Sequence, residues 1–289
     1  MSIKESELIL NKDGSVYHLN LKPEHIANNI ILVGDPDRVK KVAKHFDSIE
    51  FSTEKREFKT ITGYYKKTKI SVISTGIGPD NIDIVLNELD ALVNIDLKSR
   101  LTKNTLTKLN IVRIGTSGSL QADIPINSFL LSSHGLDLNG MLQTYKIDDI
   151  SDLEIEEAFI EHTNWSEKKP YPLIIPLSYS LGTKFVSDEI YQGITATAGG
   201  FYGPQGRVLR LELQDPELNE KIDSFQFKKH RVTNLEMETS AIYGLAKLLG
   251  HHAVSMNAII ANRANGTFSK NPAKVIEELI KYTLDKLVD

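Results

Sequence analysis

The segment FYGPQGRVLRL, residues 201–211, places a glutamine and an arginine two positions apart, behind an aromatic pair and a Gly-Pro dipeptide. This dipeptide favours a tight turn, because Gly203 tolerates a positive φ and a proline fixes its own φ. Such a turn would hold the side chains of Gln205 and Arg207 at one place. Glutamine offers a donor and an acceptor and arginine offers only donors, so the pair suits a planar ligand with an amide-like edge. The alternative is a surface turn with two solvated side chains.

Three glycine turns follow apolar runs of the chain, at Gly34, at Gly76 and Gly78, and at Gly115 and Gly118. In open α/β sheets, ligands bind beyond the carboxyl ends of the strands, where such turns gather. None of these turns has the Gly-Lys-Ser/Thr ending of a P-loop or the GxGxxG pattern of a dinucleotide site. They therefore indicate a ligand site of some other kind.

Arginines and hydroxyl groups accompany two of these turns. Arg38 follows the first turn, Arg113 precedes the third, and Thr116 and Ser117 lie within the third. Guanidinium forks, hydroxyls and main-chain N–H groups together form a phosphate site. Taken one at a time, Arg38 is better explained as a solvated helix residue and Arg113 as part of a structural ion pair.

The tripeptide Glu236-Met237-Glu238 precedes an amphipathic segment. Two carboxylates on either side of a methionine can hold a diol, since a carboxylate accepts hydroxyl hydrogen bonds and a methionine packs against a sugar face. The alternative is that acidic residues favour the first turn of any helix.

The elements that must position these residues alternate between strands and helices. Helices are expected after Asp35-Pro36, in 236–252 with Gly250 as the C-terminal cap, and after Asn271-Pro272, since each has a helical apolar face and a capping residue. Strands buried on both faces are expected in five apolar runs, 29–34, 70–75, 109–115, 128–134 and 253–262. This alternation predicts one α/β domain over 1–289 with a mostly parallel central sheet. The polar segment 96–110 fits either a helix or an inserted loop.

The composition excludes several classes of protein. With 34 Lys+Arg against 38 Asp+Glu the net charge is −4, so no basic field attracts nucleic acid or an anionic membrane. The absence of cysteine removes disulfides, zinc-thiolate sites and a cysteine nucleophile, and no HExxH or GxSxG motif occurs. No bound metal is predicted. No signal peptide or membrane span is apparent, so we expect a soluble, cytoplasmic protein.

Read in order, the motifs resemble the nucleoside phosphorylases of the uridine-phosphorylase type. The resemblance begins near Tyr17 and continues to the C-terminus, through YHLNL, VGDPDRV, REF, STGIG, RIGTSGSL, TATAGGFYGPQGR, NLEMETS and IIANR. It implies a single α/β domain with a mixed, partly barrel-like central sheet flanked by helices. It also implies a homodimer as the minimal unit, or a hexamer built from dimers.

The resemblance implies a role for each matching residue. Inorganic phosphate, a co-substrate, would lie between Gly34, Arg38, Arg113 and the Thr116-Ser117-Gly118 turn. Glu238 would hold the ribose hydroxyls, next to Met237 and Glu236. Arg56 and His18 would reach the phosphate and the 5′-hydroxyl from a neighbouring subunit. Phe201 would pack on the base, Gln205 and Arg207 would read the uracil edge, and Arg207, Gln205 and Arg113 would be the catalytic residues.

The edge of uracil suits Gln205 and Arg207, since it presents an acceptor, a donor and an acceptor at O2, N3 and O4. Purine-selecting relatives usually carry an aspartate after the last strand, where this chain has Asn262 and Arg263. The resemblance thus implies reversible phosphorolysis of uridine to uracil and ribose 1-phosphate, without a resident cofactor. A monovalent cation near Glu57 at the dimer interface is a further expectation. The alternatives are a purine nucleoside phosphorylase or nucleosidase of the same fold and a non-catalytic nucleoside-binding protein.

Overall fold

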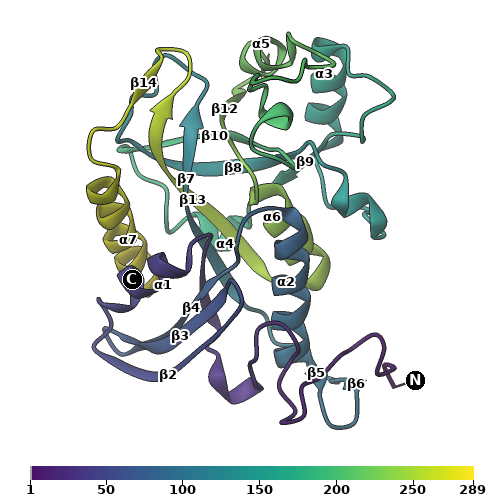
Figure 1. Ribbon diagram of the computed structural model, residues 1–289, viewed down its shortest axis with the longest axis vertical. Helices are drawn as coiled ribbons and strands as arrows, with labels where there is room; N and C mark the ends of the chain where they lie inside the picture. Colours follow the sequence, from purple (N-terminus) through teal and green to yellow (C-terminus); the bar gives the residue numbers. More distant parts are fainter. Residues whose placement is uncertain (1) are drawn as a thin grey trace.

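The computed structural model describes residues 2–289, and shows a large mixed sheet with helices on both faces (Figure 1). The strands of this sheet are β1 (Asn29–Val33), β2 (Ser48–Lys55), β3 (Phe58–Tyr65), β4 (Thr68–Ser74), β7 (Asn110–Ser119), β8 (Phe129–Asp137), β9 (Leu173–Pro176), β10 (Ile190–Thr197), β11 (Gln226–Phe227), β12 (His230–Glu236), β13 (His252–Asn262) and β14 (Thr267–Phe268). The α-helices are α1 (Pro36–Ala43), α2 (Pro79–Asn94), α3 (Leu153–Thr163), α4 (Tyr179–Gly182), α5 (Leu218–Asp223), α6 (Thr239–Leu249) and α7 (Pro272–Val288). Short 3-10 helices are η1 (Pro23–His25), η2 (Met141–Thr144) and η3 (Gly203–Gln205).

Residues of β1 alternate between two apolar cores, one on each face of the sheet. Ile30 and Leu32 pack with α2 and α6, whereas Ile31 and Val33 pack with α1 and α7. A strand buried on both faces must be apolar throughout, which explains why its sequence is a continuous apolar run. Figure 1 shows α2 and α6 on one side of the sheet and α1 and α7 on the other.

The predicted strands and capping residues are confirmed, but the helix expected in 236–252 begins only at Thr239, because Glu236 is the last residue of β12. All five apolar runs fall on strands, namely β1, β4, β7, β8 and β13. The Asp35 carboxylate accepts a hydrogen bond from the N–H of Asp37 at 2.9 Å and caps α1. Asn271 caps α7 in the same way, and Gly250 ends α6 with a φ of 80°.

The sheet is mixed and partly barrel-like, as predicted, but it is not a complete barrel. Its main strand order is β11-β12-β10-β8-β13-β7-β1-β4-β3-β2. A further antiparallel pairing of β12 with β7, at Asn234–Ser119 and Leu235–Gly118, closes β7, β13, β8, β10 and β12 into a ring. The remaining strands extend from this ring as an open sheet, parallel from β7 through β1 to β4.

The segment 96–110 contains no helix, which settles the question that its sequence left open. It begins with a short antiparallel pair, β5 (Ile95–Asp96) and β6 (Leu101–Thr102), and continues as a loop to β7. In a separate respect, within residues 2–289 no helix is long and apolar enough to cross a membrane.

The turn at residues 201–211 differs in one detail from the expectation. Gly203 and Pro204 open the 3-10 helix η3, but the glycine with a positive φ is Gly206, at 69°. The N–H groups of Gln205 and Arg207 both donate to the carbonyl of Tyr202, at 3.0 and 2.9 Å. Gly206 therefore supplies the left-handed conformation that the prediction assigned to Gly203.

Candidate active site

A cleft of about 780 Å³ opens beyond the ends of several strands. Thirteen predicted or neighbouring positions from the glycine turns, the 201–211 turn and the Glu-Met-Glu tripeptide line it, namely Gly34, Arg38, Gly76, Arg113, Thr116, Ser117, Gly118, Phe201, Gln205, Arg207, Glu236, Met237 and Glu238. Glycine turns at the carboxyl ends of parallel strands come together at one edge of a sheet, which is why distant segments meet here.

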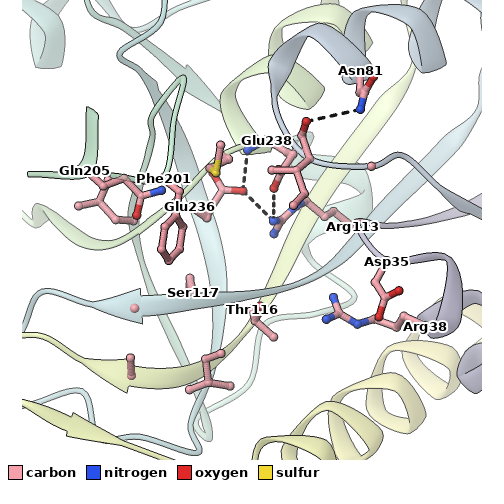
Figure 2. Close-up of a pocket in the computed structure, with 18 of the residues that line it drawn as sticks. Asp35, Arg38, Asn81, Arg113, Thr116, Ser117, Phe201, Gln205, Glu236 and Glu238 are labelled. Atoms are coloured by element: carbon pink, nitrogen blue, oxygen red, sulfur yellow. Dashed lines mark hydrogen bonds and ion pairs between the residues drawn. The ribbon is translucent and has the colours of Figure 1, made fainter. Parts of the chain in front are cut away.

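Arg113 lines one end of the cleft and is almost fully buried (Figure 2). Its Nη2 donates to Oε2 of Glu238 at 2.6 Å and lies 3.0 Å from Oε2 of Glu236, and its Nη1 donates to Oδ1 of Asn257 at 3.0 Å. Burial alone would lower the pKa of this guanidinium, but the two carboxylates outweigh burial and raise it. Arg113 is thus a fixed cation within a carboxylate frame.

The space occupied by the Arg113 guanidinium exists because residue 115 is a glycine. A Cβ placed on Gly115 would lie 1.8 Å from Nη1 of Arg113 and 2.4 Å from its Cζ. The guanidinium therefore folds back along β7 over Gly115. The structure therefore corrects the prediction of a third glycine turn, because residues 115–118 belong to the strand β7, where Gly115 makes room for the guanidinium.

The two carboxylates of the tripeptide are held differently. Glu236 accepts hydrogen bonds from Oγ1 of Thr197 at 2.7 Å and from the N–H groups of Glu238 and Thr239 at 3.0 Å, so it is anchored at the start of α6. Glu238 accepts from the N–H of Gly78 at 2.9 Å and from Arg113. Burial raises the pKa of Glu238, against the opposing charge of Arg113. Both carboxylates point towards the Arg113 guanidinium and contact it directly, as Figure 2 shows.

A second arginine lies at the same end of the cleft. Arg38 in the first turn of α1 donates from Nη1 to the carbonyl of Ile114 at 3.2 Å. Its pKa is lowered by burial and then by the positive charge of Arg113. Two guanidinium groups that repel each other, beside the Gly34 turn and the Thr116 hydroxyl, form a place where an anion is stabilised.

The opposite end of the cleft is formed by the turn at residues 201–211, with Phe201, Gln205 and Arg207. Nη1 of Arg207 donates to Oε1 of Gln205 and to the carbonyl of Phe201, both at 2.6 Å, and its guanidinium lies 3.9 Å from the centre of the Phe201 ring. Gln205 is buried, so its amide is fixed rather than solvated. The side-chain oxygen Oε1 of Gln205 has a second lone pair, which can accept a hydrogen bond from a ligand. The side-chain N–H₂ of Gln205 and the guanidinium of Arg207 supply further donors.

The structure separates Arg56 and His18 from this cleft. Neither residue lines it, although Glu57 does. The Arg56 guanidinium lies 6.0 Å from the ring centre of Tyr17, and Tyr17 packs edge-on against His18 at 4.8 Å. Nδ1 of His18 lies 2.7 Å from the Glu88 carboxylate, which also accepts from the His18 N–H. These two predicted residues therefore share a separate patch of the same chain.

Other residues of the cleft were not assigned a role from the sequence. Arg263 donates from Nη1 to the main-chain carbonyl of Gln205 at 2.8 Å. The pKa of Arg263 is lowered by burial and then by the charge of Arg207. Asn81, Ile260 and Phe268 also line the cleft. The available signal for Arg263 was its place directly after the longest apolar strand, β13.

The chain is similar to known phosphorylases in sequence and in fold. Residues 29–287 match the family described as the phosphorylase superfamily. A protein of Thermococcus kodakarensis described as uridine phosphorylase is 31% identical over 283 residues, which are 93% of this chain and 87% of that protein. A DeoD-type purine nucleoside phosphorylase of Listeria monocytogenes is 25% identical over 240 residues, 83% of this chain and 84% of its own. Among solved structures, a Trypanosoma brucei nucleoside phosphorylase described as showing uridine phosphorylase activity has a TM-score of 0.88 and 28% identity, over 97% of this chain and 99% of its own.

Proposed function

Because this chain belongs to the phosphorylase superfamily, we propose that it catalyses the reversible phosphorolysis of uridine to uracil and ribose 1-phosphate. The observation that carries the proposal is the division of the cleft into two ends, with Arg38 and Arg113 at one and the Gln205–Arg207 pair at the other. The relatives described as uridine phosphorylases support the same reaction.

Phosphate binds in this proposal at the end that holds Arg38 and Arg113. The two guanidinium groups repel each other, so an anion between them relieves that repulsion. The Thr116 hydroxyl and the Gly34 turn line the same region and supply uncharged donors. Phosphate is a co-substrate here, and the reaction as proposed uses no resident cofactor.

Ribose lies between the two ends, against Met237 and Glu238. The Glu238 carboxylate lines the cleft, and Arg113 and the N–H of Gly78 hold it in place. A buried carboxylate with free lone pairs accepts the hydrogen bonds of sugar hydroxyls. Glu236 is already held by the start of α6, which suits it to orienting Arg113.

The base packs on Phe201 and presents its edge to Gln205 and Arg207. Oε1 of Gln205 accepts from the uracil N3–H, while the amide N–H₂ and the guanidinium donate to the uracil oxygens. A purine leaves part of this pattern unmatched, and buried polar groups left unpaired oppose its binding. The residues after β13, Asn262 and Arg263, also provide no carboxylate for a purine N7.

The chemistry consists of one displacement at C1′. The bond from C1′ to N1 breaks with its electron pair leaving on uracil, and an oxygen of phosphate forms the new bond to C1′ through an oxocarbenium-like transition state. The departing uracil anion gains a proton after it leaves. Arg207 stabilises the negative charge on that anion, and Arg38 and Arg113 align phosphate for attack, so the protein contributes positioning and electrostatics.

Each site takes two residues from a second copy of the chain in this proposal. Arg56 and His18 share a patch outside the cleft of their own chain, which suits them to completing a neighbour's phosphate and 5′-hydroxyl contacts. The minimal unit is then a homodimer, and a hexamer is an assembly of such dimers. The proposed setting is the cytoplasm, in keeping with a sequence that lacks cysteine.

The test is the phosphate dependence of the reaction. Uridine is incubated with the protein with and without inorganic phosphate, and the products are identified by ³¹P NMR and chromatography. Formation of ribose 1-phosphate and uracil only with phosphate is expected. Release of free ribose in phosphate-free buffer would indicate a nucleosidase, and binding of uridine without cleavage would indicate a nucleoside-binding protein.

A further inference from the structure

A chain of buried polar side chains runs inside the strand ring behind the cleft. It begins at Arg113 on β7, crosses β13, β8, β10 and β12 in turn, and returns to β7 at Ser117. The four intermediate residues are completely buried, and none of them lines the cleft, namely Asn257, Ser132, Thr195 and Asn234. The pairing of β12 with β7 brings the last of them to Ser117.

The direction of this chain is fixed by chemistry at its first link. A guanidinium only donates, so Asn257 must accept from Nη1 of Arg113 with its Oδ1, at 3.0 Å. The Asn257 amide N–H₂ then faces Ser132 and donates to its Oγ at 3.1 Å. The orientation of a buried asparagine is otherwise ambiguous, and here the arginine resolves it.

The same direction continues around the ring. Ser132 Oγ lies 2.6 Å from Oγ1 of Thr195, and Oγ1 of Thr195 donates to Oδ1 of Asn234 at 2.8 Å. Because the Thr195 hydrogen is used on Asn234, Ser132 is the donor in the first of these bonds. Nδ2 of Asn234 then donates to Oγ of Ser117 at 2.8 Å.

Ser117 ends the chain as an acceptor. Within residues 2–289, no hydrogen bond has the Ser117 hydroxyl as its donor, and this residue lines the cleft. Its hydrogen is therefore left for a ligand. The chain links the orientation of a cation at the phosphate end to the donor direction of a hydroxyl in the same cleft.

We propose that Asn257 is a positioning residue, which aims Arg113 at phosphate and, through Ser132, Thr195 and Asn234, commits the Ser117 hydroxyl to donate to the bound ligand. This inference rests on the proposed function, because it takes phosphate as the anion that Arg113 binds. A hydrogen bond to a charged group contributes enough that its loss corresponds to roughly a 10-fold change in affinity or more.

The first test replaces Asn257 by leucine, which has the same number and branching of side-chain heavy atoms and no hydrogen-bonding group. The dissociation constant of inorganic phosphate is measured by calorimetry on the full chain without nucleoside. We expect Asn257→Leu to weaken phosphate binding roughly 10-fold. The matched control is Asn94→Leu, since Asn94 is also buried but lies on α2 and bonds to Asp90 and Thr107. This control is expected to lower the melting temperature and leave phosphate affinity unchanged.

The second test uses smaller changes and does not depend on Asn257→Leu folding. Ser132→Ala, Ser117→Ala and the double variant are compared by kcat/KM for uridine at saturating phosphate. Sites that share no partner have additive effects, whereas members of one hydrogen-bond chain do not. We expect the loss caused by Ser117→Ala to be smaller in the Ser132→Ala background than in the wild type.

The outcomes separate this inference from the proposed function. If the wild type binds phosphate and cleaves uridine, but Asn257→Leu keeps phosphate affinity within about threefold and the serine effects multiply independently, the inference alone is overturned. If the wild-type protein binds no phosphate, the proposed function falls, and the positioning role falls with it.

Discussion

Arg207 is the residue whose replacement tests the proposed leaving-group role most severely. Its guanidinium contacts Oε1 of Gln205 and the carbonyl of Phe201, both at 2.6 Å, and it stacks on the Phe201 ring. Arg207→Ala thus removes a positive charge from the departing base and releases the amide that reads the base. Loss of one preorganised donor at a developing negative charge costs about 10²-fold or more in kcat.

The assay is steady-state phosphorolysis of uridine, followed by the change in absorbance at saturating phosphate. Arg207→Lys is the graded variant, because an ammonium keeps the charge but cannot contact two oxygens and stack on a ring as a planar fork does. We expect its kcat to fall between those of the wild type and Arg207→Ala. Both losses should appear chiefly in kcat, since the charge on uracil develops only in the transition state.

The matched control for this series is Arg210→Ala. Arg210 belongs to the same 201–211 segment and is exposed, and it does not line the cleft. Its replacement removes the same charge from the protein without touching the base site, so kcat should stay near the wild-type value. An Arg207→Ala protein with a kcat within about threefold of wild type would refute the leaving-group role, because a charge-stabilising donor cannot be removed at so small a cost.

Three further predictions follow from the geometry. Gly115→Ala should displace the Arg113 guanidinium, because the new Cβ would lie 1.8 Å from its Nη1. Phosphate affinity should then fall about 10-fold or more, while the circular dichroism spectrum stays native. Unchanged phosphate affinity would argue against this placement of Arg113. Arg56→Ala and Arg113→Ala should each be nearly inactive as separate proteins. When their subunits are mixed by refolding, about half of the dimers are mixed and each of these has one intact site of two, so about a quarter of wild-type activity should return. No recovery would count against a site shared between subunits. The pKa of His134 is lowered from 6.5 to about 4, by burial and then by His230. Protonation of His134 therefore favours the unfolded chain, and the resulting loss of unfolding free energy is small above pH 6.5 and grows as the pH falls towards 4. Urea titrations should show a fall of roughly 1.5 kcal/mol in unfolding free energy from pH 6.5 to 5 from this residue, which His134→Asn abolishes. Equal slopes for both proteins would contradict the assignment.

Sequence patterns predicted the parts of the fold that burial controls on both faces. The strands β1, β4, β7 and β13 are apolar runs because they contribute residues to both helix-covered cores, and in β8 Leu131 and Leu136 lie in two different apolar cores. The strands β2 and β12 were not predicted, for opposite reasons. The residues of β2 (SIEFSTEK) are largely exposed at the sheet edge, and β12 (HRVTNLE) carries polar residues that bond inside the strand ring. Neither composition gives the apolar signal of a buried strand.

The sequence predicted many of the residues that line the cleft, but not the contacts among them, and it also named Arg56 and His18, which do not line it. Arg113 and Glu238 are 125 positions apart, and no local pattern indicates that they form an ion pair at 2.6 Å. The folding of Arg113 over Gly115 likewise depends on the pairing of β7 with β13, which is a tertiary event. Arg263 was overlooked because a single arginine after a strand has many ordinary explanations.

The ratio of kcat/KM for uridine to kcat/KM for inosine is the most direct test of whether the cleft selects a pyrimidine nucleoside. Both nucleosides are assayed at the same saturating phosphate concentration, and kcat/KM is compared. A site that pairs with the uracil edge through Gln205 and Arg207 should prefer uridine by about 10²-fold or more, because a purine leaves buried polar groups unpaired. Equal or higher efficiency with inosine would contradict the account and would make the purine alternative the better description of this cleft.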